Sequence, residues 1–444
     1  MFAKINSVGL LGLDSYMVDV EADLTHGKYK FDIVGLPDAA VSEARERVVS
    51  AIKNSGLIFE PTRHVTVNLA PADTRKEGAI YDFPVLVAIL AATKQIRADL
   101  MYSAFVGELS LSGELRRING VLPMVIAAKE NNMRVIYVPY DNADEGAIVE
   151  GIQVYPVRTV RELVNHLNGK SFIKPVAIKK YEMADPDPLL PDFCDVKGQQ
   201  EVKRALEVAA AGGHNVMMIG PPGSGKSMLA KRIPSILPDM TFEEALETTK
   251  IYSLAGELKS ELSIINARPF RSPHHTVSAV GLSGGGSVPK PGELSLAHNG
   301  VLFLDELPEF SRIAMEVMRQ PMENGSITIS RAACTLTYPC DVMVICAMNP
   351  CPCGYYGHPT KPCRCPKGAP ARYLAKVSGP LLDRLDIHIE VPQVDYSQLS
   401  DKAQGEKSSL IRERVNRARK LQQERLKGTG VNCNAKMTSG QTRK

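Results

Sequence analysis

The sequence predicts an α/β protein in which a smaller α+β domain is followed by a doubly wound parallel sheet. Three observations support this fold class. Helical and strand-like runs alternate through the first 169 residues, as in the helix expected over 39–55 and the strand over 63–69. Further along, an apolar strand runs into a glycine-rich loop. A second apolar strand, Val301–Leu304, ends in two acidic residues, which is typical of a parallel sheet with a site at its carboxyl edge.

The length and composition indicate a soluble globular protein. The 444 residues suffice for two or three domains of ~100 to 200 residues. Hydrophobic residues make up 44% and charged residues 23%, which argues against a disordered or fibrous chain. The longest apolar run, residues 83–92, is shorter than the ~20 residues that cross a bilayer, and the N-terminus lacks the features of a secretory signal. We therefore expect a cytoplasmic protein without a membrane partner.

The net charge of +4 is unevenly distributed. Residues 407–444 carry 11 Lys and Arg but only two acidic residues, Glu413 and Glu424, which gives this end a charge of +9. The rest of the chain therefore sums to −5. A basic end on a mildly acidic body points weakly to nucleic acid, and the alternative is a solvated helix face.

Four segments can be distinguished along the chain. Residues 1–169 form the first predicted domain. Residues 170–192 contain four prolines and no clear apolar period, which predicts a linker. Residues 193–395 carry the strand-loop-helix units of the second domain, with a cysteine-rich insertion at 349–368. Residues 396–444 begin a charged helical end.

The glycine-rich loop has the features of a phosphate-binding P-loop. It follows an apolar strand at 215–219 and precedes a helix expected over 228–237. Its backbone N–H groups can surround a phosphate, Lys226 adds a cation for the outer phosphates, and Ser227 offers a hydroxyl to magnesium. The loop consists of Gly220, Pro221, Pro222, Gly223, Ser224, Gly225, Lys226 and Ser227. We therefore predict nucleotide binding.

The acidic pair after Val301–Leu304 supplies the carboxylates that phosphoryl transfer needs. We expect Asp305 to hold the magnesium ion and Glu306 to polarise the attacking water. The alternative for Glu306 is to cap the helix that follows Pro308.

Two further residues are candidates for the same chemistry. A strand over 342–347 leads to Asn349, whose amide can contact the terminal phosphate or the water, although an Asn before Pro is also a common turn residue. Arg384 lies between Asp383 and Asp386. It can reach the nucleotide of a neighbouring subunit as a charge-stabilising finger, or form a local ion pair.

Seven of the nine cysteines lie between Cys334 and Cys365, which in a cytosolic chain indicates a metal before disulfides. Two C-x-C pairs are separated by nine residues, and four thiolates at this spacing can close a tetrahedral zinc site. Free or redox-active thiols and disulfides are the alternatives, and His358 can compete as a ligand. The four candidate ligands are Cys351, Cys353, Cys363 and Cys365.

The order of these motifs resembles an AAA+ ATPase. Residues 268–276 (RPFRSPHHT) and 291–300 (PGELSLAHNG) resemble its magnesium-chelatase-like branch. Residues 31–37 (FDIVGLP) and 67–73 (VNLAPAD) resemble the competence-associated ComM/YifB family, so that the resemblance covers nearly the whole chain. Members of that family are regarded as ATP-driven DNA motors, hexameric helicases that promote branch migration during DNA recombination in natural transformation.

The resemblance implies an ATPase that uses ATP and Mg²⁺, forms a homo-hexamer and acts on single-stranded, forked or branched DNA. It supports Asn349 as a sensor and Arg384 as a finger acting in trans, and it places Gln199 beside the nucleotide. It also implies a helix-2 insert within about residues 250–295 and a pore hairpin at 326–338, with Arg331 as a candidate phosphate contact.

The resemblance also raises two competing functions. The first domain is similar to the S5-like domain of Lon-type proteases, but the positions of the protease Ser and Lys hold Ile80 and Leu122, which cannot act as nucleophile and base. We therefore expect a non-proteolytic scaffold. The second alternative is the motor subunit of a magnesium chelatase that acts on a tetrapyrrole. The Lon-like domain and the C-x-C pairs argue against it.

The resemblance implies that an AAA+ core continues into a helical lid. We expect residues 396–444 to be the exposed start of a C-terminally shortened lid. We also expect hydrolysis by the shortened chain to be weak until the lid is restored.

Overall fold

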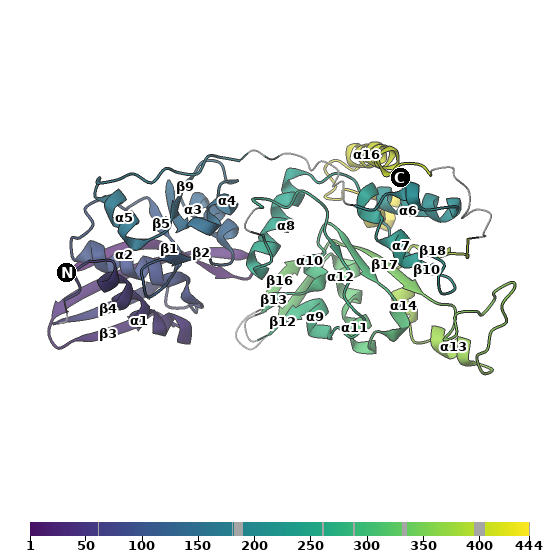
Figure 1. The fold of residues 1–444 in the computed structure, drawn as a ribbon, viewed down its shortest axis with the longest axis horizontal. Coiled ribbons are helices and arrows are strands. Elements are labelled where there is room, and N and C mark those ends of the chain that lie inside the picture. Colours follow the sequence, from purple (N-terminus) through teal and green to yellow (C-terminus); the bar gives the residue numbers. More distant parts are fainter. Residues whose placement is uncertain are drawn as a thin grey trace. The chain divides into compact units, whose positions relative to one another are not determined.

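The computed structural model of the chain describes residues 1–60, 62–179, 181, 190–259, 262–286, 289–330, 335–394 and 405–443 (Figure 1). The chain forms two compact units, Met1–Tyr181 with Thr249–Ile265, and Glu182–Thr248 with Asn266–Lys444. The predicted α/β fold class is confirmed, because one unit is a mixed sheet with helices and the other is built on a parallel sheet. Within the described ranges, no helix has the length and apolar character needed to cross a membrane.

The first unit is built around a seven-stranded sheet in the order β3-β4-β2-β1-β5-β8-β9. Its β1–β2 and β2–β4 pairs are antiparallel and its other pairs are parallel. A small antiparallel pair, β6–β7, lies outside this sheet. The strands are β1 (Phe2–Leu11), β2 (Asp14–His26), β3 (Lys30–Val34), β4 (Arg63–Ala70), β5 (Ser103–Phe105), β6 (Glu108–Leu109), β7 (Leu115–Arg116), β8 (Val135–Pro139) and β9 (Gln153–Val157).

Helices of the first unit pack on this sheet through apolar faces. The Asp38 carboxylate caps the first helix by accepting a hydrogen bond of 2.7 Å from the Val41 N–H. Val41, Ala44 and Val48 of that helix are buried at the spacing of one helical face. The predicted apolar run at 83–92 forms a helix that is buried nearly all round. The helices are α1 (Ala39–Asn54), α2 (Asp82–Ala92), α3 (Val121–Glu130), α4 (Ala143–Gly146) and α5 (Val160–Leu167).

The first unit also contains a segment from far along the chain. Thr249–Ile265 comprises the last part of α8 (Phe242–Ala255) and the residues after it. Ser253 accepts a hydrogen bond of 3.1 Å from the Gly120 N–H, and its hydroxyl donates to the carboxylate of Glu145, which is almost fully buried. The second predicted domain, 193–395, is therefore interrupted in the structure, because this segment finds its buried partners in the first unit.

The second unit is built on a five-stranded parallel sheet in the order β11-β14-β17-β10-β18. Two separate antiparallel hairpins, β12–β13 and β15–β16, accompany it. The predicted hairpin at 326–338 is present as β15–β16, but Arg331 lies outside the described residues. The strands are β10 (Val216–Ile219), β11 (Phe270–Arg271), β12 (Gly284–Gly285), β13 (Lys290–Pro291), β14 (Val301–Leu304), β15 (Ser326–Ser330), β16 (Thr335–Pro339), β17 (Met343–Met348) and β18 (Ile387–Glu390).

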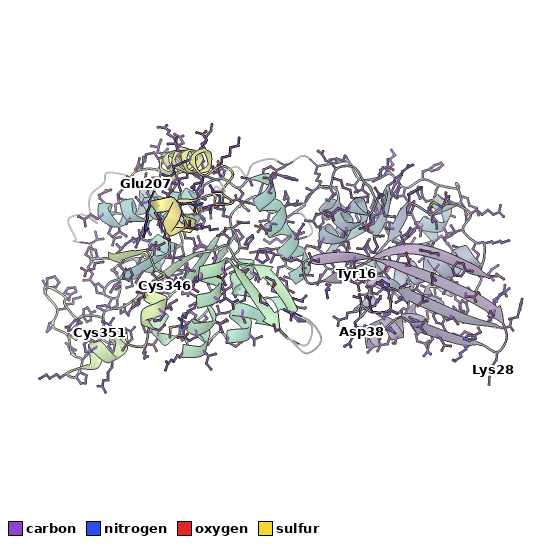
Figure 2. All side chains as sticks on the ribbon, turned by 180° about the vertical axis from the view of Figure 1, so that it is seen from behind. Tyr16, Lys28, Asp38, Glu207, Cys346 and Cys351 are labelled. Atoms are coloured by element: carbon purple, nitrogen blue, oxygen red, sulfur yellow. The ribbon has the colours of Figure 1, made fainter. Side chains whose placement is uncertain are left out.

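The strands at the centre of this sheet are fully apolar. All residues of β14 and β17 are buried, and burial raises the pKa of the Cys346 thiol in β17 to about 12, so Cys346 is a core residue as expected (Figure 2). The helices of the unit are α6 (Gln200–Gly212), α7 (Lys226–Ala230), the start of α8, α9 (Ala279–Ser283), α10 (Glu293–Leu296), α11 (Arg312–Val317), α12 (Arg319–Asn324), α13 (Ala369–Leu374), α14 (Gly379–Leu382), α16 (Ser408–Arg425) and α17 (Ser439–Thr442).

The helix after the glycine-rich loop is shorter than predicted. The sequence predicts a helix over 228–237, but α7 ends at Ala230 and a 3₁₀ turn, Ile233–Ile236, follows. Pro234 explains the break, because proline has no N–H to donate within a helix.

One face of the basic C-terminal helix is packed against the core of the second unit. α16 lies against α6, and its Ile411 and Val415 are buried (Figure 1). Arg414 pairs with Glu207 of α6 at 2.7 Å, and Arg419 donates to the backbone oxygens of Ala210 and Ala211 (Figure 2 labels Glu207). The expectation of an exposed segment is therefore wrong for this face of α16, because its arginines satisfy carboxylates and helix-end carbonyls of the core.

Candidate active site

The glycine-rich loop lies between the end of β10 and the start of α7, as the sequence predicts. Gly223 and Gly225 have φ values of 76° and 90°, which favour glycine and let the backbone turn inward. The Ser224 hydroxyl is buried and has no hydrogen-bond partner within the described part of the chain. A buried polar atom without a partner fits a loop that is completed by a polar ligand.

Lys226 joins the loop to a neighbouring strand. Its ammonium donates to the backbone oxygens of Gly220 at 2.7 Å and Pro221 at 3.1 Å, and to the Asn349 side-chain oxygen at 3.2 Å. Burial lowers the pKa of Lys226, and the charge of Asp305 opposes this shift. The structure therefore brings together the predicted phosphate-binding lysine and the predicted sensor, although 123 positions separate them in the sequence.

Ser227 and Asp305 meet at the carboxyl edge of the sheet. The Ser227 hydroxyl donates to the Asp305 carboxylate at 2.6 Å. The other Asp305 oxygen accepts a hydrogen bond of 2.9 Å from the Glu306 N–H, which fixes the carboxylate. An adjacent hydroxyl and carboxylate are hard oxygen ligands of the type that Mg²⁺ prefers, so both residues fit the predicted magnesium role.

Glu306 follows β14 in a left-handed conformation, with φ of 53°. It precedes the 3₁₀ turn Leu307–Glu309, but its side chain makes no capping hydrogen bond there. In the structure Glu306 therefore does not cap the helical turn that follows it. Instead, the carboxylate lies 3.5 Å from His275 Nδ1, and the His274 and His275 rings are 4.0 Å apart. His275 belongs to the segment 268–276, but nothing in its spacing predicts a contact with Glu306.

A cavity of about 550 Å³ opens beside Glu306 and Asn349. Its lining also includes Arg372 and Tyr373 of α13, which no sequence motif singles out. Burial raises the pKa of Tyr373 to about 12, and the charges of Glu309 and Glu306 add to this, so its phenol stays protonated. Its lining residues are Glu306, Glu309, Asn349, Pro352, Ala369, Arg372, Tyr373 and Lys376.

Gln199 lies beside the loop rather than on it. Its amide donates to the backbone oxygens of Ser224 at 2.7 Å and Pro392 at 3.1 Å. Its φ of 53° is left-handed and turns the chain into α6. The structure thus places Gln199 where it ties the start of α6 to the glycine-rich loop.

Arg384 is not brought to the loop of its own chain. Its guanidinium pairs with the carboxylate of Glu323 in α12. Neighbouring Asp386 contacts the His214 ring at 3.1 Å. Within one chain, the local ion pair is therefore the arrangement that the structure shows.

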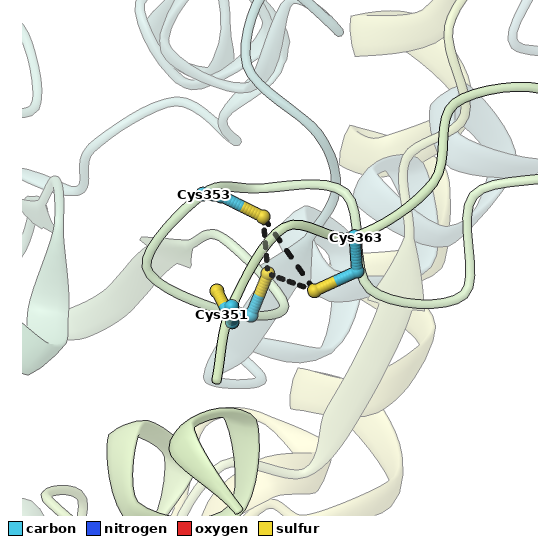
Figure 3. A group of neighbouring side chains, drawn as sticks. Cys351, Cys353 and Cys363 are labelled. Atoms are coloured by element: carbon cyan, nitrogen blue, oxygen red, sulfur yellow. Dashed lines mark hydrogen bonds between the residues drawn. The ribbon is translucent and has the colours of Figure 1, made fainter. Parts of the chain in front are cut away.

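The four predicted cysteine ligands converge in the insertion. Figure 3 labels three of them, Cys351, Cys353 and Cys363. Cys351 Sγ lies 3.4 Å from Cys353 Sγ and 3.7 Å from Cys363 Sγ, and all four ligand sulfurs lie within 4.8 Å of one another. Tetrahedral zinc with Zn–S bonds of ~2.3 Å places its sulfurs ~3.8 Å apart, so the cluster fits a metal ion. Backbone N–H groups of Tyr355 and Arg364 lower the pKa of Cys353 to about 6, which favours a thiolate ligand.

His358 does not join the cluster. Its Nε2 lies 3.3 Å from the Gln393 side-chain oxygen, and its Nδ1 accepts hydrogen bonds from the Thr360 and Lys361 N–H groups. The described cysteines are all free, so the structure shows no disulfide among them.

The insertion is also in contact with the glycine-rich loop. A Cβ added at Gly354 would lie 2.3 Å from Pro222 Cδ, which leaves room only for glycine. Gln393, whose side-chain oxygen lies 3.3 Å from His358 Nε2 of the insertion, also donates to the Pro222 backbone oxygen at 3.1 Å. The position of the cysteine loop and that of the phosphate-binding loop are therefore coupled by direct contact.

Comparison with known proteins extends these observations to nearly the whole chain. Residues 192–399 match the family described as magnesium chelatase, subunit ChlI, and residues 20–142 match the family described as subunit ChlI of Mg-chelatase. The chain is 42% identical over 444 residues to competence protein ComM of Haemophilus influenzae, covering 98% of this chain and 85% of that protein. It is also 42% identical over 422 residues to the uncharacterized protein YifB of Escherichia coli, covering 94% and 81%.

A more distant likeness is confined to part of the chain. The chain is 24% identical over 174 residues to Lon protease of Acinetobacter baumannii, covering 36% of this chain and 21% of that protein. Ile80 and Leu122 occupy the positions predicted for the protease Ser and Lys. Leu122 is buried, and its N–H donates to Glu145 at 2.8 Å.

Proposed function

Because this chain belongs to the ComM/YifB family of magnesium-chelatase-like AAA+ proteins, we propose that it is an ATP-driven DNA motor that works as a homo-hexamer. The observation that carries the ATPase part is the meeting of Lys226 with Asn349 and of Ser227 with Asp305 at one edge of the sheet. The substrate we propose is single-stranded, forked or branched DNA, and the reaction is branch migration during recombination of imported DNA. The competence name of the Haemophilus relative supports this choice.

Each residue of the site has a defined task in ATP hydrolysis. Lys226 and the loop N–H groups hold the outer phosphates, and Ser227 and Asp305 would hold a magnesium ion, which supplies positive charge to phosphate oxygens. Glu306 orients a water molecule and accepts its proton as the water oxygen bonds to the terminal phosphorus. The bond to the bridging oxygen then breaks, and ADP leaves with that electron pair.

The β15–β16 hairpin offers a surface for DNA phosphates. Ile327, Ile329 and Leu336 are buried on one face. The other face exposes Thr328 and Thr337, whose hydroxyls lie 3.1 Å apart. Hydroxyl groups contact nucleic-acid phosphates without reading their sequence, as a translocating motor requires.

We expect DNA to stimulate ATP hydrolysis by this chain. Forked and single-stranded DNA should raise the rate, and DNA binding should weaken ~10³-fold or more between 50 and 200 mM salt if six or more phosphates are contacted. The measurement is steady-state hydrolysis with and without each DNA across a salt series, together with DNA affinity at each salt concentration.

The magnesium-chelatase motor is the second candidate, because the family description of residues 192–399 names that enzyme. It predicts no response to any DNA and stimulation by a chelatase partner that binds a tetrapyrrole. Such a result would replace the DNA motor as the proposed function.

We further propose that the cysteine cluster holds one structural zinc ion, which would order a loop that has little apolar core of its own. Protein purified without chelator should contain about one zinc per chain, and the Cys363→Ser/Cys365→Ser variant should contain none and unfold at a lower temperature. Metal analysis and thermal unfolding test this, with Cys194→Ser as a control outside the cluster. A zinc-free double variant with full activity and unchanged stability would show that the cluster is not a structural metal site.

A further inference from the structure

The cavity beside Glu306 is lined by an arginine, Arg372, that belongs neither to the P-loop nor to the acidic pair. Arg372 lines this cavity of about 550 Å³ together with Glu306 and Asn349, which are both proposed to act in hydrolysis. Arg372 belongs to α13, which begins four residues after Cys365. The chain thus runs from the cysteine cluster directly into a wall of the hydrolysis site.

The charges around this cavity leave Arg372 available. Lys376 Nζ lies 3.5 Å from Glu309 Oε1, so these two charges offset each other. The Glu306 carboxylate lies 3.5 Å from His275 Nδ1, and His275 is not among the residues that line the cavity. Arg372 is exposed and forms no ion pair with any carboxylate in the described ranges. An anion that enters the cavity would therefore meet an arginine whose charge is not yet compensated.

The position of Lys226 identifies the anion. The lysine of a P-loop contacts the outer phosphates of the nucleotide. Lys226 Nζ lies 3.2 Å from the side-chain oxygen of Asn349, which itself lines the cavity. A terminal phosphate held by Lys226 would consequently lie beside the cavity that Arg372 also lines. The planar guanidinium group can bond two phosphate oxygens at once.

We propose that Arg372 binds the terminal phosphate of the nucleoside triphosphate within its own chain, as a second cation beside Lys226. This inference rests on the proposed nucleotide site and adds a residue that distinguishes the triphosphate from the diphosphate. It also gives the insertion a role in the site, because α13 begins four residues after the last cysteine of the cluster and Gly354 lies against Pro222 of the phosphate-binding loop.

The test compares the affinities of the full chain for ADP and for a non-hydrolysable ATP analogue, measured by calorimetry. Arg372→Ala should weaken analogue binding by about 10- to 100-fold, because a hydrogen bond to a charged group contributes ~1.5–3 kcal/mol. ADP binding should stay the same, and Arg372→Lys should restore part of the loss. Lys367→Ala is the matched control, since Lys367 is an exposed cation of the same loop that does not line the cavity.

Four outcomes would overturn the inference. The first is an unchanged analogue affinity in Arg372→Ala, and the second is an equal loss of ADP and analogue affinity, which indicates a structural role only. The third is a loss of DNA affinity without a loss of analogue affinity, which indicates a nucleic-acid contact. The fourth is recovery of analogue binding when Lys226→Ala chains are added to Arg372→Ala chains. Because the added chains still carry Arg372, such recovery would mean that Arg372 contacts the nucleotide of a neighbouring chain.

Failure of the DNA-motor proposal would give a different result. DNA would then fail to stimulate hydrolysis, while the selective loss of analogue affinity in Arg372→Ala would remain.

Discussion

Lys226→Ala is expected to reduce ATP hydrolysis by at least ~100-fold and to weaken nucleotide binding. Removing one preorganised contact to developing charge typically costs this much, and Lys226 is held in place by three hydrogen bonds, to Gly220, Pro221 and Asn349. The variant also removes a charge that would offset those of the phosphates. The measurements are steady-state hydrolysis with and without DNA and the affinity for a fluorescent nucleotide.

Lys231→Ala is the matched control for this variant. Lys231 is an exposed lysine that follows α7, five positions after Lys226. It should leave hydrolysis and nucleotide affinity within about twofold of the unchanged protein. Circular dichroism of both variants should match that of the unchanged protein, because neither side chain belongs to the apolar core. Hydrolysis that survives in Lys226→Ala would mean that the activity does not come from this loop.

Arg384→Ala is expected to spare nucleotide binding and to reduce hydrolysis by ~10³- to 10⁵-fold, the range for a charge-stabilising arginine finger. In its own chain the Arg384 guanidinium pairs with Glu323 of α12. The large effect therefore requires that Arg384 leave this ion pair and reach the nucleotide of a neighbouring subunit. Glu323→Gln, which removes only the ion pair, should keep at least the hydrolysis rate of the unchanged protein.

Mixing two inactive variants separates a finger acting in trans from a local ion pair. Arg384→Ala chains keep Glu306, and Glu306→Gln chains keep Arg384, so a mixed ring contains interfaces in which both groups are intact. Hydrolysis should reappear on mixing, and light scattering should report six chains per particle. If Arg384→Ala instead lowers only the unfolding temperature and hydrolyses ATP normally, Arg384 is a structural residue.

Local patterns predict the frame of the second unit. Strands such as Val301–Leu304 and Met343–Met348 are fully apolar, and their carboxyl ends must meet at one edge of a parallel sheet. For this reason the sequence alone is enough to place Asp305 and Asn349 near Lys226. The two C-x-C pairs are equally informative, because short spacings within one loop leave few ways to arrange four sulfurs.

Contacts between segments that lie far apart in the sequence cannot be predicted from local patterns. His275, Arg372 and Tyr373 have no motif spacing of their own, and they reach Glu306 only through the paths of the loops that carry them. The arginines of α16 resemble a solvated charge cluster, because sequence composition does not reveal that Glu207 and the end of α6 lie opposite. The early end of α7, by contrast, could have been predicted from the sequence, because Pro234 lies within the helix expected over 228–237.

The discontinuous makeup of the first unit limits how this gene can be divided. A product of residues 1–181 alone would lack Thr249–Ile265 and with it the Ser253 oxygen that accepts from the Gly120 N–H, at a cost of ~1–3 kcal/mol for a buried group left unsatisfied. Glu145 would lose its bond from the Ser253 hydroxyl and keep those from Leu122 and Asn142. A recombination event with a single breakpoint between the units would transfer an incomplete fold. The Lon-like unit and the ATPase unit must therefore be inherited together, because a segment of the first unit is encoded within the second.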